Sequence, residues 1–157
     1  MNKPKTFQLA RITTFTALSV VGSFIHLPGP IPTVAFDSAP GFFVALYFGP
    51  LDGFCVSGMG HLATAIINGF PLGILHFPIA LGLALSGWAI GFINRKWSMI
   101  PAIATGVAIN TVLVVLAIPV LGLAATLSFT PFLFLAASIN GILSSFVYIA
   151  VKRRLRM

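Results

Sequence analysis

The chain has 157 residues, of which 58% are hydrophobic and 7% charged, and its mean hydropathy is +1.06. A soluble domain carries about a quarter charged residues, so this composition excludes a water-soluble fold and indicates that lipid surrounds most of the chain. The net charge of +7 comes from basic residues at the two ends and at residues 95–96, whereas a nucleic-acid-binding protein gathers its bases in a stripe or patch, so no nucleic-acid partner is expected.

Turns rich in proline and glycine divide the chain into six apolar segments. Three prolines within residues 28–32 end the first segment, because proline lacks the N–H donor and clashes with the preceding helical turn. Pro101 is acceptable in the first turn of a helix, and Pro119 predicts a kink within one. The chain is therefore predicted to be an all-α integral membrane protein, with residues 1–157 forming a single six-helix domain. The predicted helices cover about residues 8–26, 39–49, 53–68, 73–93, 99–123 and 131–151.

The basic residues predict how this bundle is oriented. With six helices, both termini and the connection at residues 94–98 lie on one side of the membrane, and these three segments hold all nine bases. Cytoplasmic loops are enriched in Lys and Arg, so both termini are predicted to be cytoplasmic, whereas five or seven helices would put one basic end on the wrong side. The predicted helices 39–49 and 53–68 are shorter than the roughly 20 residues that a full span needs, which predicts that one or both are tilted or span only in part.

The predicted helix 53–68 carries a polar stripe. Ser57, His61, Thr64 and Asn68 are spaced by 4, 3 and 4 residues, which puts them on one helical face. Such side chains in a membrane either line a ligand pathway or hold helices together by hydrogen bonds. Because His and Asn are larger than close packing requires, we favour the wall of an outward-opening cavity.

The following helix shows a different pattern. Ala80, Ala84, Gly87 and Gly91 recur at helical spacing and leave a groove that a neighbouring helix can approach closely. These residues predict helix packing and not a ligand site.

Both acidic residues lie close to predicted helix starts. Asp37 and Ser38 precede the helix at 39–49, so they are candidates either to cap it or to accept hydrogen bonds from a sugar or an amine, and one residue can do both. Asp52 lies in a tight turn on the cytoplasmic side, where a capping role is expected.

Three further polar residues are placed inside predicted helices. His76 lies near the outer end of the fourth helix at a depth similar to Asn68, and Asn110 and Asn140 lie within the fifth and sixth. An amide inside a bundle either fixes the packing or binds a ligand. We favour convergence of Asn68, Asn110 and Asn140 on one polar ligand.

The residues present argue against catalysis and against a metal centre. The chain has no Glu, no defensible Ser-His-Asp arrangement and no pair of carboxylates on one helix face, so it is not expected to be an enzyme. The histidines are isolated in the sequence and Cys55 is the single cysteine, so neither a metal site nor a cofactor is expected. A small secondary transporter or channel for a polar solute remains the alternative to a binding subunit, although only His61 offers a protonatable group at mid-membrane.

The predicted topology resembles that of the substrate-binding S components of energy-coupling factor (ECF) vitamin transporters, which have six helices, both ends inside and a pocket facing out. Short motifs between residues 36 and 76 are most similar to the branch annotated for cobalamin precursors such as α-ribazole. They are Phe36-Asp37-Ser38-Ala39-Pro40-Gly41-Phe42, Phe48-Gly49-Pro50, Gly60-His61-Leu62 and Gly69-Phe70-Pro71-Leu72-Gly73.

This resemblance implies a subunit that captures a micronutrient in a bacterial or archaeal cell membrane. It implies as partners a transmembrane T subunit and two cytoplasmic ATPases, with the loop 27–38 covering the pocket. Family members meet the T subunit through an Ala-x-x-x-Ala patch on the first helix. This chain departs from that pattern, and its nearest small pairs are Ala10 with Thr14 and Thr13 with Ala17. The nickel and cobalt branch has an early histidine that is missing here, which argues against a metal substrate.

Overall fold

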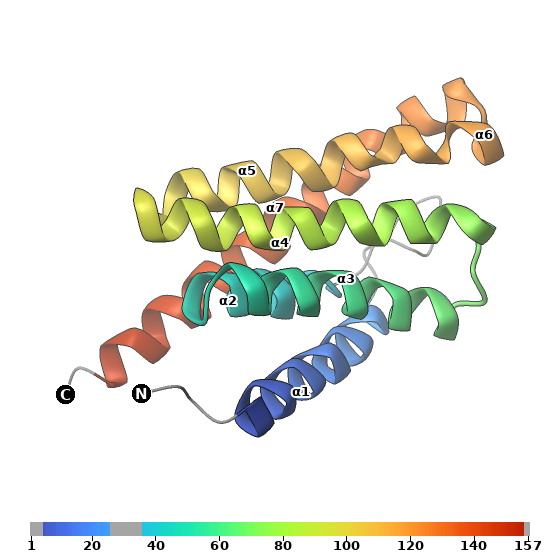
Figure 1. Ribbon diagram of the computed structural model, residues 1–157. Helices are drawn as coiled ribbons and strands as arrows, with labels where there is room; N and C mark the ends of the chain where they lie inside the picture. The colour runs from blue at the N-terminus through green and yellow to red at the C-terminus, as the bar shows by residue number, and fades with distance from the viewer. Residues whose placement is uncertain (1–4, 26–35, 156–157) are drawn as a thin grey trace.

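The computed structural model describes residues 5–25 and 36–155, and every regular element in these ranges is helical. Long helices run side by side through the bundle, and α1 crosses the others obliquely (Figure 1). The elements are α1 (Lys5–Ser23), α2 (Ala39–Tyr47), α3 (Pro50–Ile67), a 3-10 turn η1 (Gly73–Leu75), α4 (His76–Lys96), α5 (Met99–Val112), a 3-10 segment η2 (Leu113–Ala117), α6 (Ile118–Leu121) and α7 (Leu123–Arg154).

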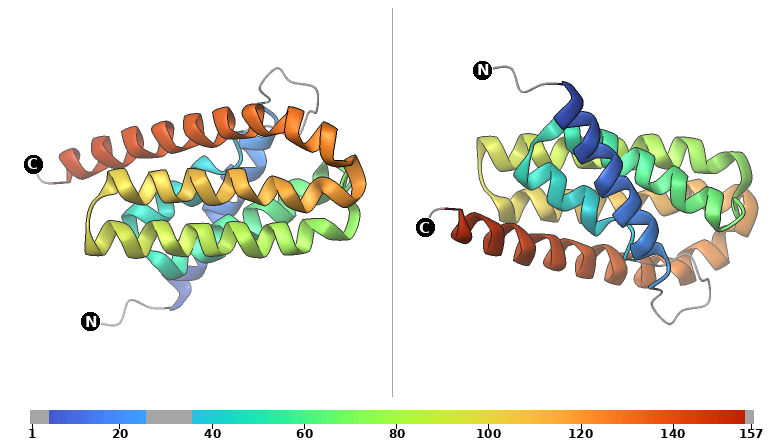
Figure 2. Two further views of the ribbon diagram at one scale, coloured as in Figure 1. Left: turned by 90° about the horizontal axis from the view of Figure 1, so that it is seen from above. Right: turned by 90° about the horizontal axis from the view of Figure 1, so that it is seen from below.

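The predicted helix boundaries need one correction of substance, at α7. We expected this helix to begin at residue 131, but it begins at Leu123 and contains Pro131 in its interior. The chain turns instead at Gly122, whose φ of 78° is easily adopted only by glycine. Membrane helices tolerate an internal proline better than helices in water do, and in the turns before Pro131 the hydroxyls of Thr126 and Thr130 donate to the carbonyl oxygens of Gly122 and Thr126. The part of α7 next to α6 is bent (Figure 2, left).

The predicted kink at Pro119 is present. The helix that starts at Met99 changes to 3-10 geometry over Leu113–Ala117 and resumes as the short α6, in whose first turn Pro119 lies. Pro119 has no N–H for the carbonyl of Val115, so the α-helical ladder is interrupted there. The first helix begins earlier than expected, at Lys5, and it ends at Ser23, before the expected end at residue 26, because residues 24–25 already form a turn.

Three helical stretches are long and apolar enough to cross a membrane: Gly73–Lys96, Met99–Leu121 and Leu123–Arg154. By contrast, α2 has 9 residues and extends only about 14 Å along its axis, about half of the hydrocarbon thickness. The second helix is therefore short, as expected, and its partial span of the bilayer stays a prediction.

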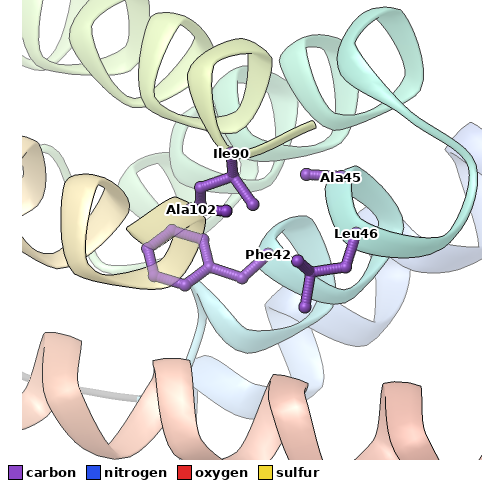
Figure 3. Close-up of a cluster of buried hydrophobic side chains, with 5 residues drawn as sticks. All are labelled: Phe42, Ala45, Leu46, Ile90 and Ala102. Carbon is purple, nitrogen blue, oxygen red and sulfur yellow. The ribbon is translucent and has the colours of Figure 1, made fainter. Parts of the chain in front are cut away.

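The apolar core joins α2 to the long helices. Phe42, Ala45 and Leu46 of α2 pack against Ile90 of α4 and Ala102 of α5, and all five side chains are buried (Figure 3). A membrane protein gains little from the hydrophobic effect once it is in lipid, so close van der Waals contact must stabilise these helices instead.

Small residues allow that contact between α3 and α4, as predicted. A Cβ atom added to Gly87 would lie 2.3 Å from the carbonyl oxygen of Gly53, and one added to Gly91 would lie 2.5 Å from the nitrogen of Pro50. The two backbones therefore approach each other with no room for a side chain. The packing role predicted for the small residues of the fourth helix is confirmed.

Charged and polar contacts tie together the end of the bundle where α2 meets α3. Asp52 accepts hydrogen bonds from Gln8 and Arg11 of α1, and Arg11 also lies 4.4 Å from the ring centre of Phe48. Arg95 donates to the carbonyl oxygen of Phe48. Asp52 was expected to cap a helix, but it makes no capping bond and instead anchors α1. The start of α1, the α4–α5 turn and the end of α7 all lie toward this end (Figure 2).

Candidate binding site

A cavity of about 100 Å³ lies inside the bundle, between the turn that precedes α2 and the helices α3, α4, α5, η2 and α7. One water needs about 10–15 Å³ on the same measure. The cavity is therefore several times larger than a single water requires, and it can hold the polar part of a small molecule. Its polar lining consists of Asp37, Ser38, His61, His76, Asn110 and Asn140. All six were predicted as binding residues, and they come from five separate segments of the chain.

Asp37, Ser38 and Asn110 form a chain of hydrogen bonds on one side of the cavity. The hydroxyl of Ser38 donates to the Asp37 carboxylate at 3.2 Å, and the amide nitrogen of Asn110 donates to the Ser38 hydroxyl oxygen at 3.4 Å. Neither Asp37 nor Ser38 makes the side-chain capping bond to α2 that was the other expectation for them. Asp37 and Asn110 both line the cavity, and each has a side-chain oxygen that can accept a hydrogen bond.

Asn140 of α7 supplies the missing cap. Its side-chain oxygen accepts the backbone N–H of Ala39 at 2.9 Å, and its side-chain nitrogen donates to the carbonyl oxygen of Ala136. Ser144 adds a bond to the carbonyl oxygen of Ala39 at 3.0 Å. Because the first N–H groups of a helix have no partner within the helix, Asn140 fixes the start of α2, and with it Asp37, against α7.

His61 and His76 meet on the other side. Nε2 of His76 accepts the backbone N–H of Leu72 at 3.2 Å, so the proton of a neutral His76 must be on Nδ1. That Nδ1 lies 3.1 Å from Nε2 of His61, which therefore accepts, and the proton of a neutral His61 is on Nδ1. The network assigns both tautomers. It leaves the Nδ1–H of His61 as a donor for a ligand.

The rest of the wall is apolar and was not foreseen. Phe129 and Leu133 of α7 line the cavity together with Leu83 of α4 and Leu113 and Val114 of η2. Phe129 was missed because the sixth helix was expected to start only at residue 131, which placed this aromatic in a loop. A helical pattern running through Pro131 was the signal that would have found it.

Three residues of the predicted polar stripe are not part of the lining. Ser57 is buried where α3 meets α2 and α4, and a Cβ at Gly41 would lie 2.5 Å from its oxygen. The Thr64 hydroxyl is buried with no hydrogen-bond partner among the described residues. Asn68 is exposed at the end of α3, where its amide donates to the Thr64 carbonyl oxygen. Of the stripe, only His61 reaches the cavity.

The electrostatics of the cavity favour neutral or cationic ligands. Among the described residues that line it there is no Lys or Arg, and Asp37 is the one acidic residue. Burial raises the pKa of Asp37 from 3.8 to about 6, and hydrogen bonds from Ser38 and the backbone oppose that rise only in part. An anionic ligand would meet no compensating positive charge here.

Comparison with known proteins identifies the family. A family model for the substrate-specific component of ECF transporters matches residues 7–152, which is nearly the whole chain. No curated protein and no solved structure gave a significant match. The family consists of transport subunits and not enzymes, and its membrane-embedded character agrees with the apolar helices described above. The chain belongs to the substrate-specific components of ECF transporters and is a multi-pass membrane protein.

Proposed function

We propose that this protein captures a vitamin or vitamin precursor in the cavity bounded by Asp37, His61, His76, Asn110 and Asn140. The observation that carries the proposal is the meeting of these five polar side chains around one space whose remaining wall is apolar. A polar group in a membrane bundle is costly unless it is paired or has a function. Here, acceptor and donor atoms remain available to a ligand.

The chemistry of the wall favours a heteroaromatic nucleoside, and α-ribazole is the candidate we propose. Asp37 and Asn110 offer acceptor oxygens that suit the hydroxyl groups of a ribose. The Nδ1–H of His61 suits a heteroaromatic nitrogen, and Phe129 offers a ring face for a flat base. The absence of basic residues from the lining argues against phosphorylated or carboxylated vitamins.

We further propose six membrane segments, with both termini in the cytoplasm of a bacterium or archaeon and the whole chain acting as one domain. The 19 residues of α1 and 18 of α3 correspond to about 29 and 27 Å, close to the hydrocarbon thickness, while α2 spans only in part. The basic residues support this orientation, because Arg11, Arg95 and Lys152 all lie near the end of the bundle where α2 meets α3.

The partners we propose are a T subunit and two ATPases, as the family implies. Ala10, Thr13, Thr14 and Ala17 are all exposed on one face of α1, opposite the buried Ile12 and Ser19. A small-residue face of this kind allows a second helix to approach closely. We propose this face as the surface that docks on the T subunit.

Binding and uptake measurements test the proposal. The purified protein is expected to bind one α-ribazole per chain with a Kd below about 1 µM, and to accumulate none in vesicles until the T subunit and ATPases are added with ATP. Gradient-driven uptake by the isolated protein would instead support a stand-alone transporter. Tight binding of a different vitamin would keep the capture function and replace the substrate.

A further inference from the structure

A second cleft lies at the basic end of the bundle, away from the cavity. It measures about 480 Å³ and separates the α4–α5 turn from the last turns of α7. Its lining residues are Asn94, Trp97, Ser98, Met99, Tyr148, Ile149, Lys152 and Arg153. Tyr148 and Met99 also pack against the helix core, whereas Lys152 and Arg153 are exposed and take no part in that packing.

No acidic side chain of the described residues pairs with the basic groups of the cleft. Within residues 5–25 and 36–155, the one salt bridge joins Arg11 to Asp52, and neither Asp37 nor Asp52 lines the cleft. Lys152 donates one hydrogen bond to the Tyr148 hydroxyl at 2.9 Å, which leaves two of its three N–H groups available. Arg153 is exposed and adds a planar set of five donors. Paired basic side chains of this kind suit a phosphate group.

The surroundings of the cleft match the boundary between lipid and water. Trp97 is 70% exposed and Tyr148 lines the opposite wall, and such aromatics are typical of the headgroup level of a bilayer. Exposed apolar side chains accompany these groups: Ile149, which lines the cleft, is 38% exposed, and Ile100, next in sequence to the lining residue Met99, is 77% exposed. A lipid whose phosphate lies in the cleft can therefore place its acyl chains on apolar protein surface.

We propose that this cleft binds the phosphate of an anionic phospholipid headgroup, with Lys152 and Arg153 as the main ligands and Trp97 and Tyr148 as flanking walls. The bound lipid holds the α4–α5 turn against the end of α7. The shared chemistry is a phosphate anion, and the lipid is distinguished from free phosphate by its apolar tails. This inference depends only on the protein being embedded in a membrane and not on the identity of its substrate.

Native mass spectrometry of the full-length protein, released from bilayers of phosphatidylglycerol and phosphatidylcholine, tests the proposal. We expect one phosphatidylglycerol retained per chain in preference to phosphatidylcholine. The double variant Lys152→Gln/Arg153→Gln is expected to lower that retention about 30-fold, from roughly fivefold per basic residue. Lys5→Gln/Arg154→Gln removes the same charge from exposed residues of the same end that do not line the cleft, and it is expected to retain the lipid.

Three outcomes would overturn the proposal. Equal loss in both double variants would mean that the net charge and not the cleft attracts the lipid. Displacement of the lipid by millimolar inorganic phosphate would identify a site for the free anion. Unchanged retention in Lys152→Gln/Arg153→Gln, together with loss of binding to the T subunit or the ATPases, would make the cleft a protein-docking surface. Thermal unfolding of both variants checks that the fold is intact.

Discussion

Nε2 of His61 lies 3.1 Å from Nδ1 of His76, and the second ring nitrogen of His76 is occupied by the backbone N–H of Leu72. This contact joins α3 to α4 across 15 residues of sequence. It also determines which nitrogen of each neutral ring carries the proton. In His61 that nitrogen is Nδ1, which is therefore a hydrogen-bond donor. His76 is therefore a positioning residue, and His61 is the residue proposed to touch the substrate.

His61→Ala is expected to weaken substrate binding. Removing one hydrogen bond in a buried site costs roughly 1–3 kcal/mol, or about 5- to 150-fold in Kd, and isothermal titration measures it. Asn68→Ala is the matched control, because Asn68 lies on the same helix but is exposed and bonds only to its own helix. Equal losses in the two variants would contradict the assignment of the cavity.

The raised pKa of Asp37, which lines the cavity, predicts that substrate binding depends on pH. Burial raises its pKa to about 6, so the carboxylate loses its charge as the pH falls through 6. A ligand that donates hydrogen bonds to the carboxylate binds the charged form more tightly, so affinity is expected to be full above pH 7 and to fall below pH 6. Asp37→Asn is expected to bind more weakly and to lose this dependence. A wild-type Kd that stays constant between pH 5 and 8 would exclude Asp37 from the contact.

Asn140→Leu is expected to destabilise the protein, and because Asn140 is buried the change leaves the outer surface unaltered. The variant leaves the N–H of Ala39 buried without its acceptor, which costs roughly 1–3 kcal/mol and appears as a lower unfolding temperature in detergent. Ser138→Ala, on the same helix, removes only a bond to its own helix backbone and is expected to change stability by less than about 0.5 kcal/mol. Equal unfolding temperatures for the two variants would mean that the hydrogen bond from Ala39 to Asn140 does not contribute to stability.

Two glycines of α4 are expected to respond differently to alanine. At Gly87 the new methyl group would meet the backbone carbonyl of Gly53 at 2.3 Å, whereas at Gly82 it would meet only the flexible end of Leu113. Gly87→Ala is expected to cost about 1–3 kcal/mol from forced separation of α3 and α4. For Gly82→Ala, the higher helix propensity of alanine contributes about 1 kcal/mol and offsets the cost of displacing the Leu113 side chain. Thermal unfolding compares the two, and similar losses would mean that α3 and α4 do not pack as described.

Much of the fold could be predicted from the sequence, because its strongest signals are local. Proline-rich turns and long apolar runs set most helix boundaries, and small residues at helical spacing predicted the α3–α4 contact that Gly87 makes. The start of α7 was missed because Pro131 acts as a helix breaker in water but is tolerated in a membrane helix whose Thr side chains bond to the backbone.

The cavity was predictable only in part. Nine polar residues were selected as candidates, mainly because polar groups are costly in lipid, which is a property of each residue alone, and six of them line the cavity. The polar stripe shows the limit of that argument: Ser57, His61, Thr64 and Asn68 share a helical face, but of these four only His61 lines the cavity. The bond from Ala39 to Asn140 joins residues 101 positions apart, and no local pattern indicates it.

The most direct test of the central claim is a structure of the protein with its bound substrate. The account predicts density for one small molecule between the carboxylate of Asp37, the amide of Asn110 and Nδ1 of His61, with its flat ring against Phe129. A substrate bound elsewhere on the protein, with these side chains contacting only one another, would contradict it.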